Sequence, residues 1–82
     1  MIKGRKQRRN ETAILTLAYN IKRYRIEKDL TIEELANLIG VDYSQISRME
    51  RGLVNANISI VFDIADALQI EPYQLLSTLV HK

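Results

Sequence analysis

Two helix-boundary signals that lie nine residues apart limit how this chain can fold. Thr31 is followed three residues later by Glu34, and this spacing is typical of a capping box. In such a box the Thr31 hydroxyl accepts the Glu34 amide hydrogen, while the Glu34 carboxylate accepts the Thr31 amide hydrogen. Gly40 tolerates the left-handed conformation that ends many helices. The pattern therefore predicts a short helix that begins at Ile32 and ends before Gly40.

A second short helix is predicted almost immediately afterwards. Asp42 and Gln45 have the spacing of another capping box, and Gly52 suits the left-handed residue just past a helix end. We therefore expect a helix over about 43–51. The turn before it has room for only three residues, 40–42.

The rest of the chain also reads as helical, because it combines few helix breakers with repeated apolar spacings of three and four. Only three glycines and one proline occur in 82 residues. The first helix is predicted over about 11–28 with Asn10 as its cap, the fourth begins after Asn57, and the fifth runs over about 72–80 from Pro72. Apolar positions define the expected core: Ile14, Leu17, Ala18, Ile21, Tyr24, Ile60, Val61, Ile64, Ala65, Leu68 and Leu75.

A chain of 82 residues is expected to form one domain around one small core. The lack of cysteine excludes a disulfide framework and thiolate metal sites. No apolar run approaches the roughly 20 residues of a membrane span, and the amino terminus lacks the apolar segment of a secretory signal. We therefore expect a soluble, cytoplasmic protein without a membrane partner.

Charge is distributed unevenly along the chain. Residues 1–10 carry five lysines or arginines and no acid, whereas residues 11–82 carry seven against ten acids. The first segment is therefore predicted to be a flexible basic arm, and 11–82 the folded domain. Such an arm either helps to keep the chain in solution or contacts a polyanion, and the residues leave both roles open.

The two short helices carry a specific spacing of small and apolar residues. Counted from Ile32, alanine stands at position five, glycine at nine and isoleucine at fifteen; LTIEELANLIGVDYSQISRMERG is then followed by NISIVFDIADALQIEPYQLL. Over about residues 17–76 the chain resembles the lambda-repressor-like, or Xre-type, helix-turn-helix family. The resemblance implies an all-α, five-helix DNA-binding domain with the helix-turn-helix proper over about 32–51. It also implies a transcriptional regulator that recognises a specific sequence in double-stranded DNA.

Helical geometry divides the residues of the second short helix between two faces. Ile46 and Met49 fall on the inward face, and positions 43, 44, 47, 48 and 51 fall on the opposite one. In the family this outer face lies in the DNA major groove. The resemblance therefore implies that four residues read base edges: Tyr43, Ser44, Ser47 and Arg48. The planar guanidinium of Arg48 matches the acceptors O6 and N7 of guanine. Tyr43 either contacts a base or packs over the turn.

The resemblance also implies contacts to the DNA phosphates at the rim of this face. The expected residues are Thr31, Gln45, Arg51, Asn55 and Asn57, because helix amino termini and exposed amides attract anions. The chain departs from the family pattern at Ile32, where many relatives carry a glutamine that helps to hold a phosphate. In relatives the residues that match Arg25 and Glu50 form an ion pair behind the reading surface, so these two are assigned to structure.

The fifth predicted helix is more apolar than one small domain requires. Leu75 is expected to face its own core, while Leu76, Leu79 and Val80 are expected to form a homodimer interface. The alternative is that this helix packs back on the first helix and buries all of these residues. A homodimer would suit a near-palindromic operator, since a two-fold protein matches two half-sites.

Other classes of function find little support in the residues. The chain has no glycine-rich phosphate loop, no spaced metal ligands and no nucleophile with a base, and its one histidine is His81 near the end. We therefore expect no enzyme activity, no cofactor and no small-molecule ligand. The alternative to a repressor or controller is an antitoxin-type or bridging protein-interaction module. The sequence does not separate restriction-modification, phage and toxin-antitoxin contexts.

Overall fold

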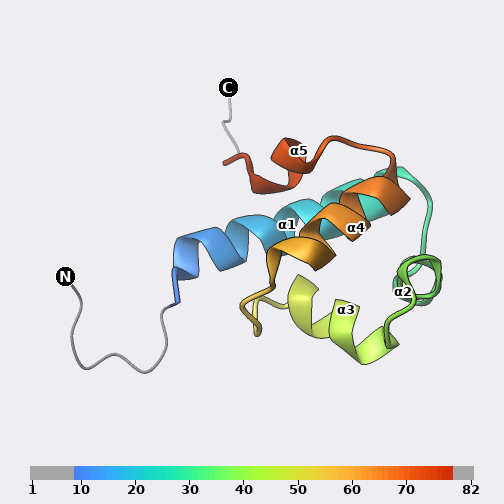
Figure 1. Ribbon diagram of the computed structural model, residues 1–82, viewed down its shortest axis with the longest axis horizontal. Helices are drawn as coiled ribbons and strands as arrows, with labels where there is room; N and C mark the ends of the chain where they lie inside the picture. Colours follow the sequence, from blue (N-terminus) through green and yellow to red (C-terminus); the bar gives the residue numbers. More distant parts are fainter. Residues whose placement is uncertain (1–8, 79–82) are drawn as a thin grey trace.

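The structure is a computed structural model, and it describes residues 9–78. This part of the chain contains five helices and no strand: α1 (Glu11–Glu27), α2 (Ile32–Ile39), α3 (Tyr43–Glu50), α4 (Ile58–Leu68) and α5 (Pro72–Leu76). Figure 1 shows α1 as the longest helix, with α5 on one side of it and α3 on the other. The predicted all-α, five-helix fold is confirmed.

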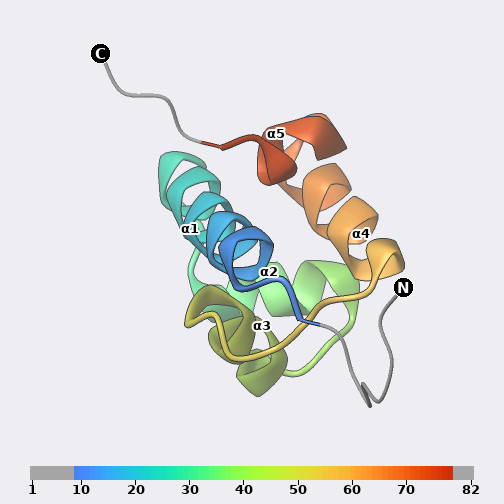
Figure 2. The same ribbon diagram turned by 90° about the vertical axis from the view of Figure 1, so that its left-hand side faces the viewer.

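One apolar core joins all five helices. α1 contacts α3, α4 and α5, while α2 packs on α3 and α4. Figure 2 shows α1 and α4 on opposite flanks of the domain, with α5 above and α3 below. Every predicted core residue is buried except Tyr24, which is partly exposed, and the fully buried side chains come from several helices: Ile21, Leu35, Ile46, Ile64, Leu68 and Leu75.

The capping box of α2 forms as the sequence predicts. The Thr31 hydroxyl accepts from the Glu34 amide at 3.0 Å, and the Glu34 carboxylate accepts from the Thr31 amide at 2.8 Å. Gly40 ends the helix with φ 75°, in the left-handed region. Asn57 caps α4 by accepting from the Ile60 amide at 3.0 Å, and Asn10 caps α1 in the same way. These boundaries are local features, and the sequence places them correctly.

The second predicted capping box, between Asp42 and Gln45, is wrong. Asp42 occupies the position before α3, but its side chain makes no capping hydrogen bond. The Gln45 amide instead donates to the backbone carbonyl of Asp42 at 3.0 Å. The backbone carbonyl of Asp42 thus takes the Gln45 amide hydrogen that its carboxylate was expected to accept. At the other end, α3 stops at Glu50, one residue earlier than predicted, and Arg51 is its C-cap.

The prediction that the fifth helix extends to about residue 80 is also corrected, because α5 ends at Leu76. The side chain of Asn20 donates through Nδ2 to the carbonyl of Leu75 at 2.9 Å and to that of Ser77 at 3.0 Å. An α-helix that continued would need the Leu75 carbonyl for its own next turn. Ser77 is extended, with φ −77° and ψ 132°. Leu79 and Val80 lie outside the described residues.

Candidate nucleic-acid interface

α3 exposes one polar side and buries the other. Ile46 and Met49 are 0% and 3% exposed and anchor the helix in the core. Tyr43, Ser44 and Arg48 are exposed on the opposite side, and Ser47 is half-buried beside them. Tyr43 keeps 55% of its surface exposed, so its ring is not buried over the preceding turn. The four residues expected to read bases therefore share one accessible helix face.

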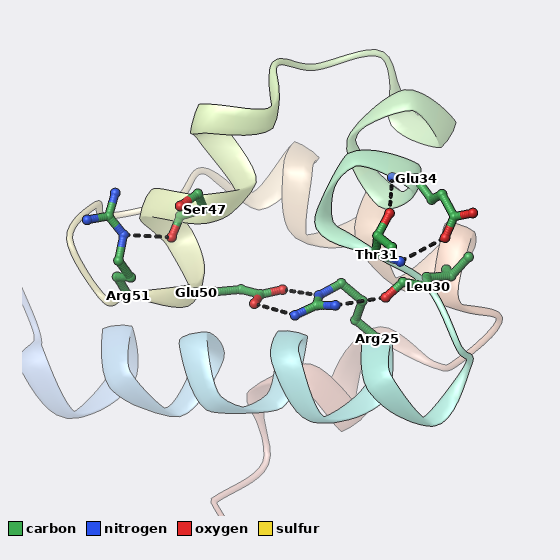
Figure 3. A network of polar contacts seen from close by, with 7 residues as sticks. All are labelled: Arg25, Leu30, Thr31, Glu34, Ser47, Glu50 and Arg51. Atoms are coloured by element: carbon green, nitrogen blue, oxygen red, sulfur yellow. Dashed lines mark hydrogen bonds and ion pairs between the residues drawn. The ribbon is translucent and has the colours of Figure 1, made fainter.

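An ion pair connects the far end of α3 to α1. Arg25 donates from Nε to one oxygen of Glu50 at 2.6 Å and from Nη2 to the other at 3.0 Å. Its third bond runs from Nη1 to the Leu30 carbonyl at 2.7 Å, just before α2 (Figure 3). The two side chains are only 11% and 5% exposed. Arg25 thus ties together α1, the start of α2 and the end of α3.

The ionised state of Arg25 is strongly favoured. Its hydrogen bond to Glu50 raises the pKa of Arg25 above the ordinary value, and this effect outweighs the opposing effect of burial. A bidentate arginine–carboxylate pair also fixes direction, because two parallel bonds hold both planar groups. The pair therefore limits rotation of α3 on the core and keeps its polar face in one orientation.

The residues expected to contact phosphate lie around the edge of α3 and in the segment that follows it. Arg51 is exposed at the end of α3, where its Nε donates to the Ser47 carbonyl at 3.4 Å (Figure 3). Asn55 and Asn57 are exposed between α3 and α4, and Gln45 is half-buried in the first turn of α3. The Asn57 side-chain oxygen already caps α4. The donors that Asn57 can still offer to an anion are therefore its side-chain NH2 group and its backbone amide.

The start of α2 is less suited to phosphate than the sequence pattern suggests. Both the hydroxyl and the amide of Thr31 are used within the capping box (Figure 3). Glu33 and Glu34 add two carboxylates to the first turn. Ile32, at the position where many relatives have glutamine, is partly buried against the core. The donors left for a phosphate at this point are the hydrogen of the Thr31 hydroxyl and the backbone amides beyond Thr31, next to the negative charge of the two glutamates.

Beyond Lys28, the lysines and arginines of the described residues lie only at the end of α3. No lysine or arginine occurs between residues 29 and 47 or between residues 52 and 78, whereas Arg48 and Arg51 lie three positions apart. Arg48 therefore adds positive charge to the exposed face of α3, and Arg51 follows at the end of that helix. Within residues 9–78, no group of three or more histidine or acidic side chains is placed to hold a metal ion.

One buried polar residue was missed by the sequence interpretation. Asn20 is 1% exposed, and it orders the end of α5 through the two bonds described above. The signal was present, since position 20 lies three residues after Leu17 and therefore on the apolar stripe of α1. A polar residue on a buried stripe calls for a partner inside the fold.

The order of the helices and the polar face of α3 agree with the comparisons to known proteins. A model of the helix-turn-helix family matches residues 21–75, which is more than half of the chain. The chain belongs to this helix-turn-helix family. Membership confirms the lambda-repressor-like or Xre-type assignment and places the chain among the helix-turn-helix regulators of transcription.

Individual relatives support the same family. A hypothetical transcription factor of Neisseria meningitidis serogroup B is 40% identical over 60 residues, which cover 73% of this chain and 57% of that relative. The present chain thus matches little more than half of that relative's length.

Within residues 9–78, no helix is both long enough and apolar enough to cross a membrane.

Solved structures of family members have the same helical arrangement. A hypothetical transcription factor from Neisseria superposes with a TM-score of 0.79 at 33% identity, over 90% of this chain and 86% of that chain. The restriction-modification controller protein C.AhdI from Aeromonas hydrophila gives 0.75 at 33% identity, over 78% of this chain and 97% of that chain. The controller C.Esp1396I, solved as a tetramer with its natural operator of 35 base pairs, gives 0.74 at 27% identity over 80% and 87%.

Proposed function

We propose that this protein is a transcriptional regulator that binds a specific sequence of double-stranded DNA as a homodimer, in the manner of a repressor or controller. The observation that carries the proposal is the exposed polar face of α3, held in one orientation by the ion pair between Arg25 and Glu50. A preorganised helix that presents hydrogen-bonding side chains suits the major groove.

Four side chains of α3 are proposed to read base edges: Tyr43, Ser44, Ser47 and Arg48. Arg48 offers two parallel donors to guanine O6 and N7, and such a pair contributes about 1–3 kcal/mol to discrimination between bases. Arg51 follows the helix and is proposed to contact phosphate, together with Thr31, Gln45, Asn55 and Asn57. Phosphate contacts add affinity and fix the register of the protein on DNA.

An exposed apolar surface supports the homodimer. Leu76 of α5 is 51% exposed, and Ile58 and Phe62, which share one side of α4, are 62% and 50% exposed. Ile58 and Leu76 line a common hollow of about 210 Å³ between α1, α4 and α5. A two-fold contact lets an apolar side chain of each copy enter the hollow of the other. Leu79 and Val80 belong to the same proposed interface by sequence, but they lie outside the described residues.

The similar structures narrow the proposal to a role as a controller protein. Two of the similar structures are restriction-modification controllers, and one of these is a tetramer on its operator. For a dimer of the present chain, the centres of the two half-sites should lie about 34–36 Å apart, or one turn of DNA. A near-palindromic operator follows from the two-fold symmetry of such a dimer.

Selection from a random pool of double-stranded DNA tests this function, with the mass of the complex measured on the selected site. We expect a consensus of two inverted half-sites bound by two copies, with affinity that falls steeply as salt rises. The variant Lys28→Ala is the control for the loss of one exposed cation. Lys28 lies outside the proposed interface, so this variant should select the same consensus as the wild type. Absence of any selected consensus would instead favour the alternative of an antitoxin-type or bridging protein-interaction module.

A further inference from the structure

Asp42 lies immediately before α3 and carries a carboxylate that the fold does not use. The side chain is exposed and makes no capping hydrogen bond, and the Gln45 amide donates to the backbone carbonyl of Asp42 instead. None of the ion pairs within residues 9–78 includes Asp42. Its carboxylate oxygens are therefore available to a molecule that approaches the amino end of α3.

Acidic side chains are rare in and around α3. Between residues 35 and 62 the chain has only two, Asp42 and Glu50. The Glu50 side chain is 5% exposed and bound to Arg25. Within this segment, Asp42 is therefore the one acid whose carboxylate an approaching ligand can reach.

The position of Asp42 places it beside two of the residues proposed to read bases. It directly precedes Tyr43 and Ser44, which are exposed in the first turn of α3, and its backbone is extended with φ −74° and ψ 148°. In helix-turn-helix complexes the amino-terminal residues of the recognition helix contact base edges. A residue at the N-cap of α3 therefore approaches the base edges when α3 enters the groove.

We propose that Asp42 reads a cytosine in the major groove by accepting a hydrogen bond from its N4 amino group. This inference rests on the proposed function and adds a fifth residue to the four assigned to base reading. An ionised carboxylate can only accept hydrogen bonds. In the major groove guanine and thymine present acceptors, adenine presents a donor beside an acceptor, and cytosine presents a donor alone. Cytosine is therefore the base whose edge matches a carboxylate.

The same carboxylate disfavours the other bases. Opposite guanine or thymine it would lose water and meet another acceptor, which leaves both groups without a hydrogen bond. Its negative charge also opposes the DNA phosphates at every sequence, and only a cytosine at the right position offsets this cost. Asp42 therefore adds specificity mainly by weakening the binding of wrong sequences. The positive charge of Arg48, in contrast, attracts DNA of any sequence.

A structural role for Asp42 predicts different effects. A carboxylate at the amino end of a helix interacts favourably with the helix dipole, so its removal would lower the stability of α3. A less stable α3 would bind all DNA sequences more weakly and by about the same factor. It would leave the preferred base at each position unchanged, so base preference is the measurement that separates the two roles.

Selection from a random DNA pool with variants of the full chain tests the inference. The wild type should select cytosine at one position of each half-site. Asp42→Ala should lower the preference for that base about tenfold and keep the rest of the consensus. Asp42→Asn should accept adenine there as well, because an asparagine amide matches adenine N6 and N7. Asp63→Asn, which changes an exposed acid of α4, is the matched control and should select the wild-type consensus.

A modified base identifies the atom that Asp42 contacts. The selected cytosine is replaced by 2-pyrimidinone, which lacks the N4 amino group, and affinities for the two duplexes are compared. The wild type and Asp63→Asn should each lose about tenfold more affinity than Asp42→Ala loses. The comparison between proteins cancels any effect of the modified base on the duplex itself.

Circular dichroism establishes that the variants fold, and Asp42→Asn decides alone if the alanine variant does not. The inference is overturned if Asp42→Ala keeps the full wild-type consensus, if Asp42→Asn still rejects adenine, or if loss of the amino group weakens the wild type and Asp42→Ala equally. Each of these results, obtained with a wild type that selects a consensus, leaves the proposed function standing. A wild type that selects no consensus overturns the proposed function and this inference together.

Discussion

Arg25 of α1 and Glu50 at the last turn of α3 form a bidentate ion pair that is almost fully buried. The same guanidinium also holds the Leu30 carbonyl, so one side chain fixes both ends of the helix-turn-helix unit on α1. Base recognition needs side chains held within a narrow range of positions, and rigid support from a second layer of contacts provides this. The pair therefore supports the exposed polar face of α3 from behind and is not part of that face.

Arg25→Ala should lower the stability of the fold without removing a direct contact to DNA. The substitution leaves the nearly buried Glu50 carboxylate without its partner, and breaking such a pair costs about 3–5 kcal/mol. Thermal unfolding followed by circular dichroism measures this as a large fall in midpoint. Arg25→Lys is the control: it keeps the charge but loses the bidentate geometry, so an intermediate midpoint is expected. An unchanged midpoint with lost DNA binding would mean that Arg25 contacts phosphate instead.

Arg48→Ala and Arg51→Ala should affect binding in different ways. Loss of Arg48 should lower affinity for the selected site by about 1–3 kcal/mol and relax the preference at one base pair. Loss of Arg51 should weaken binding to all sequences about equally, because a phosphate contact carries no base information. Affinities for the consensus and for every single-base variant decide between these outcomes. If neither substitution changed the consensus or the specificity ratio, the assigned orientation of α3 would be incorrect.

Deletion of residues 1–8 should reduce the salt dependence of DNA binding without changing the selected consensus. It removes four cations but keeps Arg9, which is paired with Glu11 at 2.8 Å. Each released phosphate contact contributes a slope of about −0.9 to log affinity against log salt, so the plot should flatten by about two to four units if half or more of these charges engage. An identical slope would identify the arm as a bystander, and a changed consensus would show that it reads bases.

Asn20→Leu should destabilise the attachment of α5 to α1. The substitution keeps a similar volume but removes the donors to the Leu75 and Ser77 carbonyls, which would cost about 2 kcal/mol for groups left without a partner. Urea unfolding measures the loss. Asn37→Leu, at an exposed position of α2, is the matched control and should change the midpoint little. Equal stability of the two variants would show that α5 does not depend on these hydrogen bonds.

Gly40→Ala should destabilise the domain through the backbone alone. Gly40 has φ 75°, and a Cβ at this position would meet no atom within 4 Å. The left-handed conformation costs an alanine about 1–2 kcal/mol, whereas asparagine tolerates it better. Chemical unfolding of Gly40→Ala and Gly40→Asn should therefore give the alanine variant the lower stability. The reverse order would indicate that contacts of the side chain, rather than φ, control this position.

Helix starts show where sequence reading succeeded and where it failed. Thr31 and Glu34 form their predicted box, but Asp42 and Gln45 have the same spacing and form none. The difference lies in the first turn of α3, where the backbone carbonyl of Asp42 takes the amide hydrogen that the carboxylate was expected to accept. Spacing alone identifies the residues that are able to cap a helix, while the backbone geometry decides which oxygen receives the bond.

The sequence by itself determined the number of helices, most of their boundaries, the inward face of α3 and the family. Caps, glycines and apolar periodicity act within a few residues, so they can be read locally. Only the tertiary structure decided where α5 ends, because the competing donor belongs to Asn20, 55 positions before Leu75. The tertiary structure likewise decided that Asp63 and Asp66 of α4 line one hollow with Leu38 of α2. Hydrogen bonds and charges between distant segments depend on how the core packs, and no local pattern encodes that packing.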